Sequence, residues 1–136
     1  VMRAGGLNWL AVFVAAIAIY AIGFIIYGLL IPAETWMAMS GISAAEMEAV
    51  GASRMPFSVV MPLMTAIFLA VLFKLGRVVD AATGAQWAVV VALASAIPTL
   101  LYGWVYGVGP FDATLIDSGH LLLGHVAAGT ILGVWR

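Results

Sequence analysis

One hydrophobic stretch of the sequence, "LIDSGHLLLGHVAAGTILGVW" at residues 115–135, carries a carboxylate and two imidazoles. These groups, on Asp117, His120 and His125, are of the kinds that bind metals or haem and that move protons. Asp117 and His120 are three residues apart, so on a helix their side chains can touch. We expect a simple hydrogen bond between them. A proton relay, or a ligand pair completed by another helix, is the alternative.

His125 is the most deeply placed of the three groups. If its helix starts near residue 113, the ring lies roughly 18 Å along it, close to the middle of a bilayer. It points about 140° away from His120, so no metal ion shared by the two histidines is predicted. No cofactor is predicted, and an axial bond from His125 to haem, or contact with another pigment, is the alternative. We expect a neutral ring bonded to a neighbouring helix, with candidate partners Tyr20, Thr65, Ser95 and Thr99.

No catalytic residues are predicted, because the sequence offers no convincing nucleophile. It contains no cysteine, and Ser118 follows Asp117 directly, so a helix points the two side chains in different directions. One face of the first hydrophobic stretch carries, at helical spacing, Tyr20, Gly23, Phe24 and Tyr27. We interpret this face as a packing surface. An aromatic pocket, which would add both tyrosines to the candidate ligand site, is the alternative.

The composition indicates that lipid is the solvent for much of the chain. Of its 136 residues, 65% are hydrophobic and only 8% are charged, whereas soluble domains carry about 25% charged residues. The mean hydropathy is +1.19. A formal net charge of −1 provides no basic field that would attract nucleic acid, so no nucleic-acid partner is expected.

Four hydrophobic stretches are long enough to cross a bilayer, because about 20 helical residues span its hydrocarbon core. They cover approximately residues 7–31, 56–75, 86–106 and 113–135. The sequence therefore predicts an all-α, integral membrane four-helix bundle, with residues 1–136 forming a single transmembrane domain. Pro32 is expected to end the first span, and Asp112 to cap the fourth. Pro62 and Pro98 predict bends inside the second and third spans.

The first outer loop is the longest segment between spans. Its "SAAEMEAV" is a capping box, with Ser43 as the N-cap and Glu46 three residues later. This pattern predicts a short helix lying at the membrane interface, with Met47 and Val50 facing the membrane. A lid over the bundle, or a contact with a partner, is the alternative.

The basic residues predict the orientation of the chain. Arg3, Lys74, Arg77 and Arg136 fall on one side of the predicted spans, and only Arg54 falls on the other. By the positive-inside rule both termini lie in the cytoplasm, as an even number of spans also requires. Tryptophans near the span ends are expected to be interfacial anchors: Trp9, Trp36, Trp87, Trp104 and Trp135.

Small residues predict close contacts between helices. The fourth span carries a smooth side of glycines, and the first span offers Gly23 with several alanines. The glycines of the fourth span are Gly119, Gly124, Gly129 and Gly133. We expect packing inside the chain first. Because four short helices leave much surface facing the lipid, a homo-oligomer or a complex with other membrane subunits is also expected.

Two long stretches resemble one family of bacterial membrane proteins. "LNWLAVFVAAIAIYAIGFIIYGLLIPAETWM" resembles the opening of domain-of-unknown-function family 1761, and "LIDSGHLLLGHVAAGTILGVW" resembles its closing helix. The resemblance covers nearly the whole chain in order. It implies four membrane spans and a place in the bacterial inner membrane, and it brings no catalytic residues.

These patterns predict a small non-enzymatic membrane protein. We expect an accessory or scaffolding subunit of a larger membrane complex, or a bundle that associates with itself. The alternative is a transporter or binder of a small ligand, a proton or haem that uses Asp117, His120 and His125.

Overall fold

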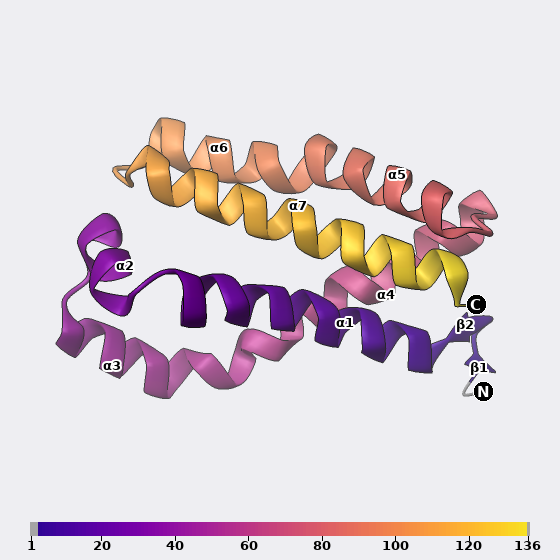
Figure 1. Ribbon diagram of the computed structural model, residues 1–136, viewed down its shortest axis with the longest axis horizontal. Coiled ribbons are helices and arrows are strands. Elements are labelled where there is room, and N and C mark those ends of the chain that lie inside the picture. Colours follow the sequence, from indigo (N-terminus) through magenta and orange to yellow (C-terminus); the bar gives the residue numbers. More distant parts are fainter. Residues whose placement is uncertain (1–2, 136) are drawn as a thin grey trace.

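The computed structural model describes residues 3–135 as long helices preceded by a short β-hairpin (Figure 1). The helical stretches that are long and apolar enough to cross a membrane are Trp9–Leu30, Ala44–Gly76, Ala81–Tyr106 and Phe111–Val134. The predicted all-α fold with four spans is confirmed. The hairpin, the turn between the second and third spans and the last turn of the fourth lie at one end (Figure 1). We call it the terminal end, and the opposite end the loop end.

The hairpin is held by a two-glycine turn. Strand β1 (Arg3–Ala4) pairs with β2 (Leu7–Asn8) in antiparallel register. Gly5 and Gly6, between them, have φ angles of +63° and +74°. Two successive left-handed residues form the tight turn that glycine accommodates without strain.

The first span begins and ends close to its predicted limits. Asn8 caps helix α1 (Trp9–Phe24), because its side chain accepts a hydrogen bond from the Ala11 amide at 3.4 Å. The helix continues as a π-helical segment, η1 (Ile25–Leu30). Pro32 follows one residue later, as expected of a residue that cannot continue a helix.

The first outer loop folds into two helices. Helix α2 (Ala33–Ser40) is a short interfacial helix that ends at the left-handed Gly41, and α3 (Ala44–Arg54) follows. Ser43 caps α3, and both halves of the predicted capping box with Glu46 are present. The interfacial helix is therefore observed, but the helix that the capping box starts leads directly into the second span.

The second span starts earlier than predicted. Helix α3 continues through a 3₁₀ segment, η2 (Met55–Val59), into α4 (Val60–Gly76), giving a continuous helical run of 33 residues. At 1.5 Å per residue this run is about 50 Å long, more than the hydrocarbon core is thick. The predicted limit at residue 56 is a change of helix type rather than a helix start.

The third span also starts earlier than its predicted limit at residue 86. It comprises α5 (Ala81–Val91), the π-helical η3 (Ala92–Ala96) and α6 (Ile97–Tyr106). The Asp80 carboxylate accepts hydrogen bonds from the Thr83 amide and hydroxyl, at 2.9 and 2.8 Å. This N-cap starts the helix about one turn before the hydrophobic stretch. The earlier start was missed from the sequence because the polar Gln86 interrupts the hydrophobic pattern.

Pro98 lies in the first turn of α6, directly after the π-helical segment. The Ile97 amide bonds to the Ala92 carbonyl, five residues back. The wider π turn is the local adjustment that accompanies the proline inside this span. Pro62 lies in the first turn of α4 after the 3₁₀ segment η2.

The fourth span, α7 (Phe111–Val134), begins at Pro110 rather than at the predicted cap Asp112. Pro110 is extended, with φ −73° and ψ 147°, and its carbonyl accepts a hydrogen bond from the Thr114 amide at 3.5 Å. Asp112 lies in the first turn instead. There its carboxylate still interacts favourably with the helix dipole.

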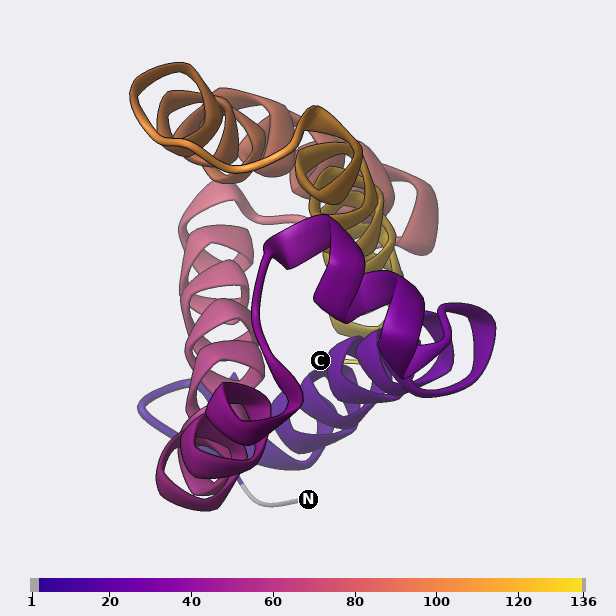
Figure 2. The same ribbon diagram turned by 90° about the vertical axis from the view of Figure 1, so that its left-hand side faces the viewer.

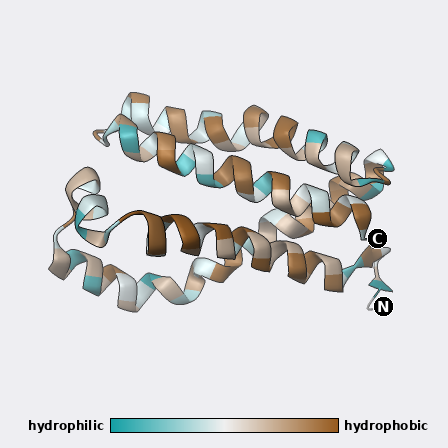
Figure 3. Ribbon diagram, in the orientation of Figure 1, coloured by the Kyte–Doolittle hydropathy of each residue, from teal (hydrophilic) through white to brown (hydrophobic). Residues whose placement is uncertain are grey.

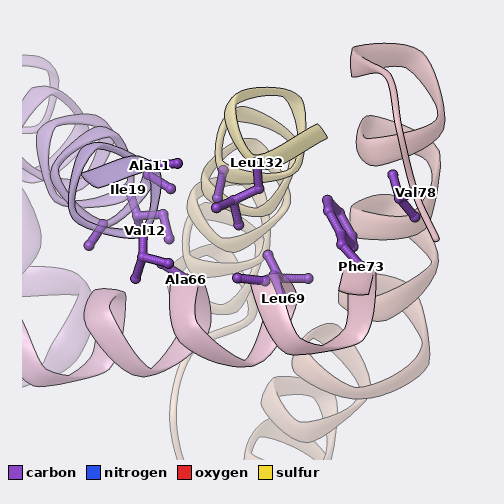
Figure 4. Close-up of a cluster of buried hydrophobic side chains, with 12 residues drawn as sticks. Ala11, Val12, Ile19, Ala66, Leu69, Phe73, Val78 and Leu132 are labelled. Atoms are coloured by element: carbon purple, nitrogen blue, oxygen red, sulfur yellow. The ribbon is translucent and has the colours of Figure 1, made fainter. Parts of the chain in front are cut away.

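Helix α7 is the centre of the arrangement. It packs against α1 and α4 on one side and against α5 and α6 on the other, as the end view shows (Figure 2). A cluster of buried side chains joins α1, α4 and α7 near the terminal end (Figure 4). Its labelled members are Ala11, Val12, Ile19, Ala66, Leu69, Phe73, Val78 and Leu132.

Hydrophobic residues run along the long helices, and α7 alternates hydrophobic with hydrophilic residues along its length (Figure 3). Many large apolar side chains are exposed, including Leu29, Phe68 and Val90. In a chain that crosses a membrane, lipid covers such side chains. The polar residues of α7 are therefore the exception to be explained.

Candidate functional site

The structure brings three of the predicted polar residues together near the loop end. Tyr27 comes from η1, and Asp117 and His120 come from α7; we call them the Tyr27–Asp117–His120 cluster. The Tyr27 hydroxyl donates a hydrogen bond to Oδ1 of Asp117. Its ring meets the His120 ring edge-on, with centroids 5.3 Å apart and planes at 87°. The ring of Trp36, from α2, also meets the Tyr27 ring edge-on, with the ring centroids 5.1 Å apart.

His120 turns towards α1 rather than towards Asp117. A Cβ placed on Gly23 would lie 2.9 Å from Nε2 of His120, so the glycine makes room for the ring. Nε2 makes no hydrogen bond in the described part of the chain. The predicted Asp117–His120 hydrogen bond does not form between these described side chains: Tyr27 bonds to the carboxylate, and the His120 ring lies against Gly23 of α1.

His125 lies outside this cluster and bonds within its own helix. The side chain is 7% exposed, and its Nδ1 is 2.7 Å from the Leu121 carbonyl oxygen. Because a carbonyl oxygen only accepts, Nδ1 carries the proton and donates. The expectation of a partner on a neighbouring helix was wrong for this nitrogen: the hydrogen bond closes one turn back on α7.

Tyr20 also lies apart from the cluster. Its hydroxyl accepts a hydrogen bond from Ser58 of η2 at 3.5 Å. Two other residues expected near His125 bond to their own helix, since Ser95 donates to the Val91 carbonyl and Thr99 to the Ser95 carbonyl. Hydroxyls satisfied in this way can face lipid without cost to the backbone.

Within residues 3–135, no group of three or more His, Cys, Asp or Glu side chains could hold a metal ion. The cluster combines one carboxylate, one phenol and one imidazole. Such a set can accept, hold and pass a proton, or bind a small polar ligand.

Glycines form the contact between α5 and α7. A Cβ on Gly84 would fall on the Gly129 carbonyl oxygen, and one on Gly133 would fall on the Asp80 carbonyl oxygen. A Cβ on Gly129 would lie 2.5 Å from that of Ala88. Gly84 was not singled out from the sequence, although its four-residue spacing to Ala88 is the small-xxx-small pattern.

The other glycines predicted to pack have different surroundings. A Cβ on Gly124 would lie 3.2 Å from Ile19 of α1, which is a close helix contact. Gly119 has no atom within 4 Å of its hypothetical Cβ, and Gly23 faces the His120 ring. The glycines of α7 therefore make close helix contacts only in the half of α7 that is nearer the terminal end.

The tryptophans lie near the two ends of the bundle, each with a different contact. Trp9 donates to the Ala4 carbonyl at 3.1 Å, and Trp87 packs over Gly76, whose Cβ would lie 2.7 Å from the ring. Trp104 packs on Phe111 with centroids 4.7 Å apart. Trp36 meets Tyr27, as above, and Trp135 lines a cavity at the terminal end.

The four apolar helical stretches and the polar cluster define a multi-pass α-helical membrane protein. The model of one family, described as "Protein of unknown function (DUF1761)", matches residues 10–133. The chain belongs to this family. No curated protein and no solved structure matches it.

Proposed function

We propose that this chain is a non-enzymatic subunit that works by associating with other membrane helices, first of all with copies of itself. The observation that supports this role is the sparse packing of the third span. Only 11% of its most apolar stretch is buried, against 28% for the first and fourth spans. Its helices pack extensively on α7 and on no other span.

The uncovered face of the third span is suited to a neighbouring helix. It carries large apolar side chains, among them Val90, Leu93 and Tyr102. Its Ser95 and Thr99 hydroxyls already bond to backbone carbonyls, so these two groups need no partner from another chain. In membranes, association then rests on van der Waals packing between such faces.

Single cysteines test this proposal, since the sequence contains none of its own. Val90, Phe68 and Ile17 are exposed to a similar extent, at 64%, 63% and 66%. Each lies eight or nine residues from the terminal end of its span. After oxidation in native membranes, Val90→Cys should give a disulfide-linked dimer, and Phe68→Cys and Ile17→Cys should stay largely monomeric.

Two results would overturn the proposal. The first is equal cross-linking of all three variants, because random collisions would produce it. The second is no cross-link at Val90 together with a single copy of the chain, and no other subunit, in protein purified from its own membrane.

The same proposal includes a place in the bacterial inner membrane with the terminal end in the cytoplasm. Arg3, Lys74 and Arg77 line one cavity at the terminal end, and Arg54 ends α3, in the part of the second span that starts at the loop end. By the positive-inside rule, the end of the bundle that carries more basic residues faces the cytoplasm.

A second candidate function rests on the Tyr27–Asp117–His120 cluster, which is suited to binding a proton or a small polar ligand. Ionisable groups inside a membrane are costly, and here three converge from two helices. If the cluster conducts protons, purified protein in vesicles should dissipate a pH gradient, and Asp117→Asn should abolish this flux. Asp112→Asn, an exposed acid on the same helix, is the control. A flux that is absent, or unchanged in Asp117→Asn, would refute this version.

A further inference from the structure

A basic cavity of about 600 Å³ opens at the terminal end. It lies where the hairpin, the end of α4 and the end of α7 meet. Three of the chain's five basic residues line it, namely Arg3, Lys74 and Arg77. No aspartate or glutamate is among the described residues of its lining. The lining thus gathers most of the basic residues of a chain whose net charge is −1.

Lys74 is fixed across the hairpin turn. Its Nζ donates to the Gly5 carbonyl at 2.8 Å, and a Cβ on Gly6 would lie 2.7 Å from the same nitrogen. An ammonium group has three donors, so two remain for a ligand. The turn thus holds the charge in place at the cavity wall without neutralising it.

Arg77 occupies a backbone position that favours glycine. It is the C-cap of α4 and has a φ angle of +51°, the only positive φ of a non-glycine residue in the described chain. Helices commonly end in this conformation with glycine, and other residues adopt it at a steric cost. A cation at this point interacts favourably with the helix dipole, but an arginine in the last turn of the helix would do so without the left-handed backbone.

Asn8 supplies an unused donor in the same wall. The residue is 8% exposed and its Oδ1 is engaged by the Ala11 amide. Its Nδ2 has no hydrogen-bond partner among the described residues. The great majority of buried donors in proteins have a hydrogen-bond partner. An unpartnered donor beside a cationic cavity therefore points to a ligand that supplies the acceptor.

We propose that this cavity binds the phosphate of an anionic phospholipid. Arginine, lysine and amide donors match phosphate oxygens, and basic pockets at the cytoplasmic ends of membrane helices recognise such head groups. The apolar part of the lining, which includes Phe73 and Leu132, continues from the cations towards the bundle core. Trp135 at the end of α7 lies at the same wall. A lipid with a charged head and an apolar body fits both parts, and a free phosphate fits only the first.

The test uses the full chain, stripped of lipid in detergent and observed by native mass spectrometry. Phosphatidylglycerol should bind as a retained single adduct, at least tenfold more tightly than zwitterionic phosphatidylcholine. Arg77→Gly and Lys74→Gln should each weaken phosphatidylglycerol binding by about tenfold, the effect of losing one charge-assisted contact. Arg54→Gln, which removes a basic residue that does not line this cavity, should leave it unchanged.

Arg77→Gly separates binding from folding, because glycine suits the left-handed backbone at this position and the helix end should be retained. Asn8→Ser likewise keeps an N-cap and removes Nδ2, so it should weaken lipid binding with little change in melting temperature. Equal binding of both lipids, or equal losses in Arg54→Gln and Arg77→Gly, would overturn the proposal. If inorganic phosphate bound as tightly as the lipid, the ligand of the cavity would be free phosphate and not a phospholipid.

Discussion

Gly84 of α5 and Gly129 of α7 meet backbone to backbone, because a Cβ on Gly84 would fall on the Gly129 carbonyl oxygen. No other residue type allows this approach. The third span packs extensively on α7 alone, and this contact is part of what holds it to the rest of the molecule. Packing of this kind, rather than a hydrophobic effect, joins helices in lipid.

Gly129→Ala should therefore destabilise the protein by about 1–3 kcal/mol, the usual cost of overpacking a close contact. The added Cβ would lie 2.5 Å from the Ala88 Cβ and from the Gly84 carbonyl oxygen. The free energy of unfolding in mixed micelles measures the effect. Gly119→Ala is the matched control on the same helix, since nothing lies within 4 Å of its Cβ. Because alanine favours the helix more than glycine does, Gly119→Ala should be neutral or slightly stabilising, and similar losses in both variants would show that the contact at Gly129 is not responsible.

Tyr27→Phe should remove the hydrogen bond that joins η1 of the first span to the Asp117 carboxylate, and we expect a loss of about 0.5–1.5 kcal/mol. The magnitude follows from polar contacts in membranes, where the unfolded reference state also finds partners. Unfolding in micelles again provides the measurement. Tyr106→Phe, an exposed tyrosine near the same end, should have no effect. An unchanged stability in Tyr27→Phe would mean that lipid or water satisfies Asp117 equally well.

Asp80→Ala should destabilise the start of α5, because its carboxylate caps the Thr83 amide and bonds to the Thr83 hydroxyl. Loss of an N-cap costs about 1 kcal/mol. Amide hydrogen exchange at Thr83 should accelerate by roughly five- to tenfold, since about 1.4 kcal/mol corresponds to a factor of ten. Asp112→Ala removes an acid from the first turn of α7 that does not cap the helix, and the Thr114 amide should change less. If both sites respond equally, helix dipoles and not capping determine these ends.

Val108→Cys, in the turn between α6 and α7, should react with a membrane-impermeant maleimide in intact cells. Val79→Cys, in the turn between α4 and α5, should react only after the membrane is permeabilised. Both residues are exposed and lie at opposite ends of the third span. Their labelling therefore measures orientation directly, and the reverse pattern would refute cytoplasmic termini.

The candidate site could be predicted only in part. Tyr27, Asp117 and His120 were all recognisable as polar residues in hydrophobic surroundings. Which of these side chains contact one another could not be predicted, because the contacts depend on the rotation of the first span about its own axis. The edge-on contact of Tyr27 with His120 and the space at Gly23 depend on that rotation.

The sequence by itself determined the four spans, the capping box at Ser43 and Glu46, and the role of Pro32 as a stop. Each of these follows from local physics: a span needs enough apolar length to satisfy its backbone inside lipid, and a cap bonds within one turn. The tertiary structure alone decided the Gly84–Gly129 contact and the gathering of Arg3, Lys74 and Arg77 around one cavity. In lipid both the packed and the exposed faces of a helix are apolar, so hydrophobic periodicity does not say which face meets which neighbour.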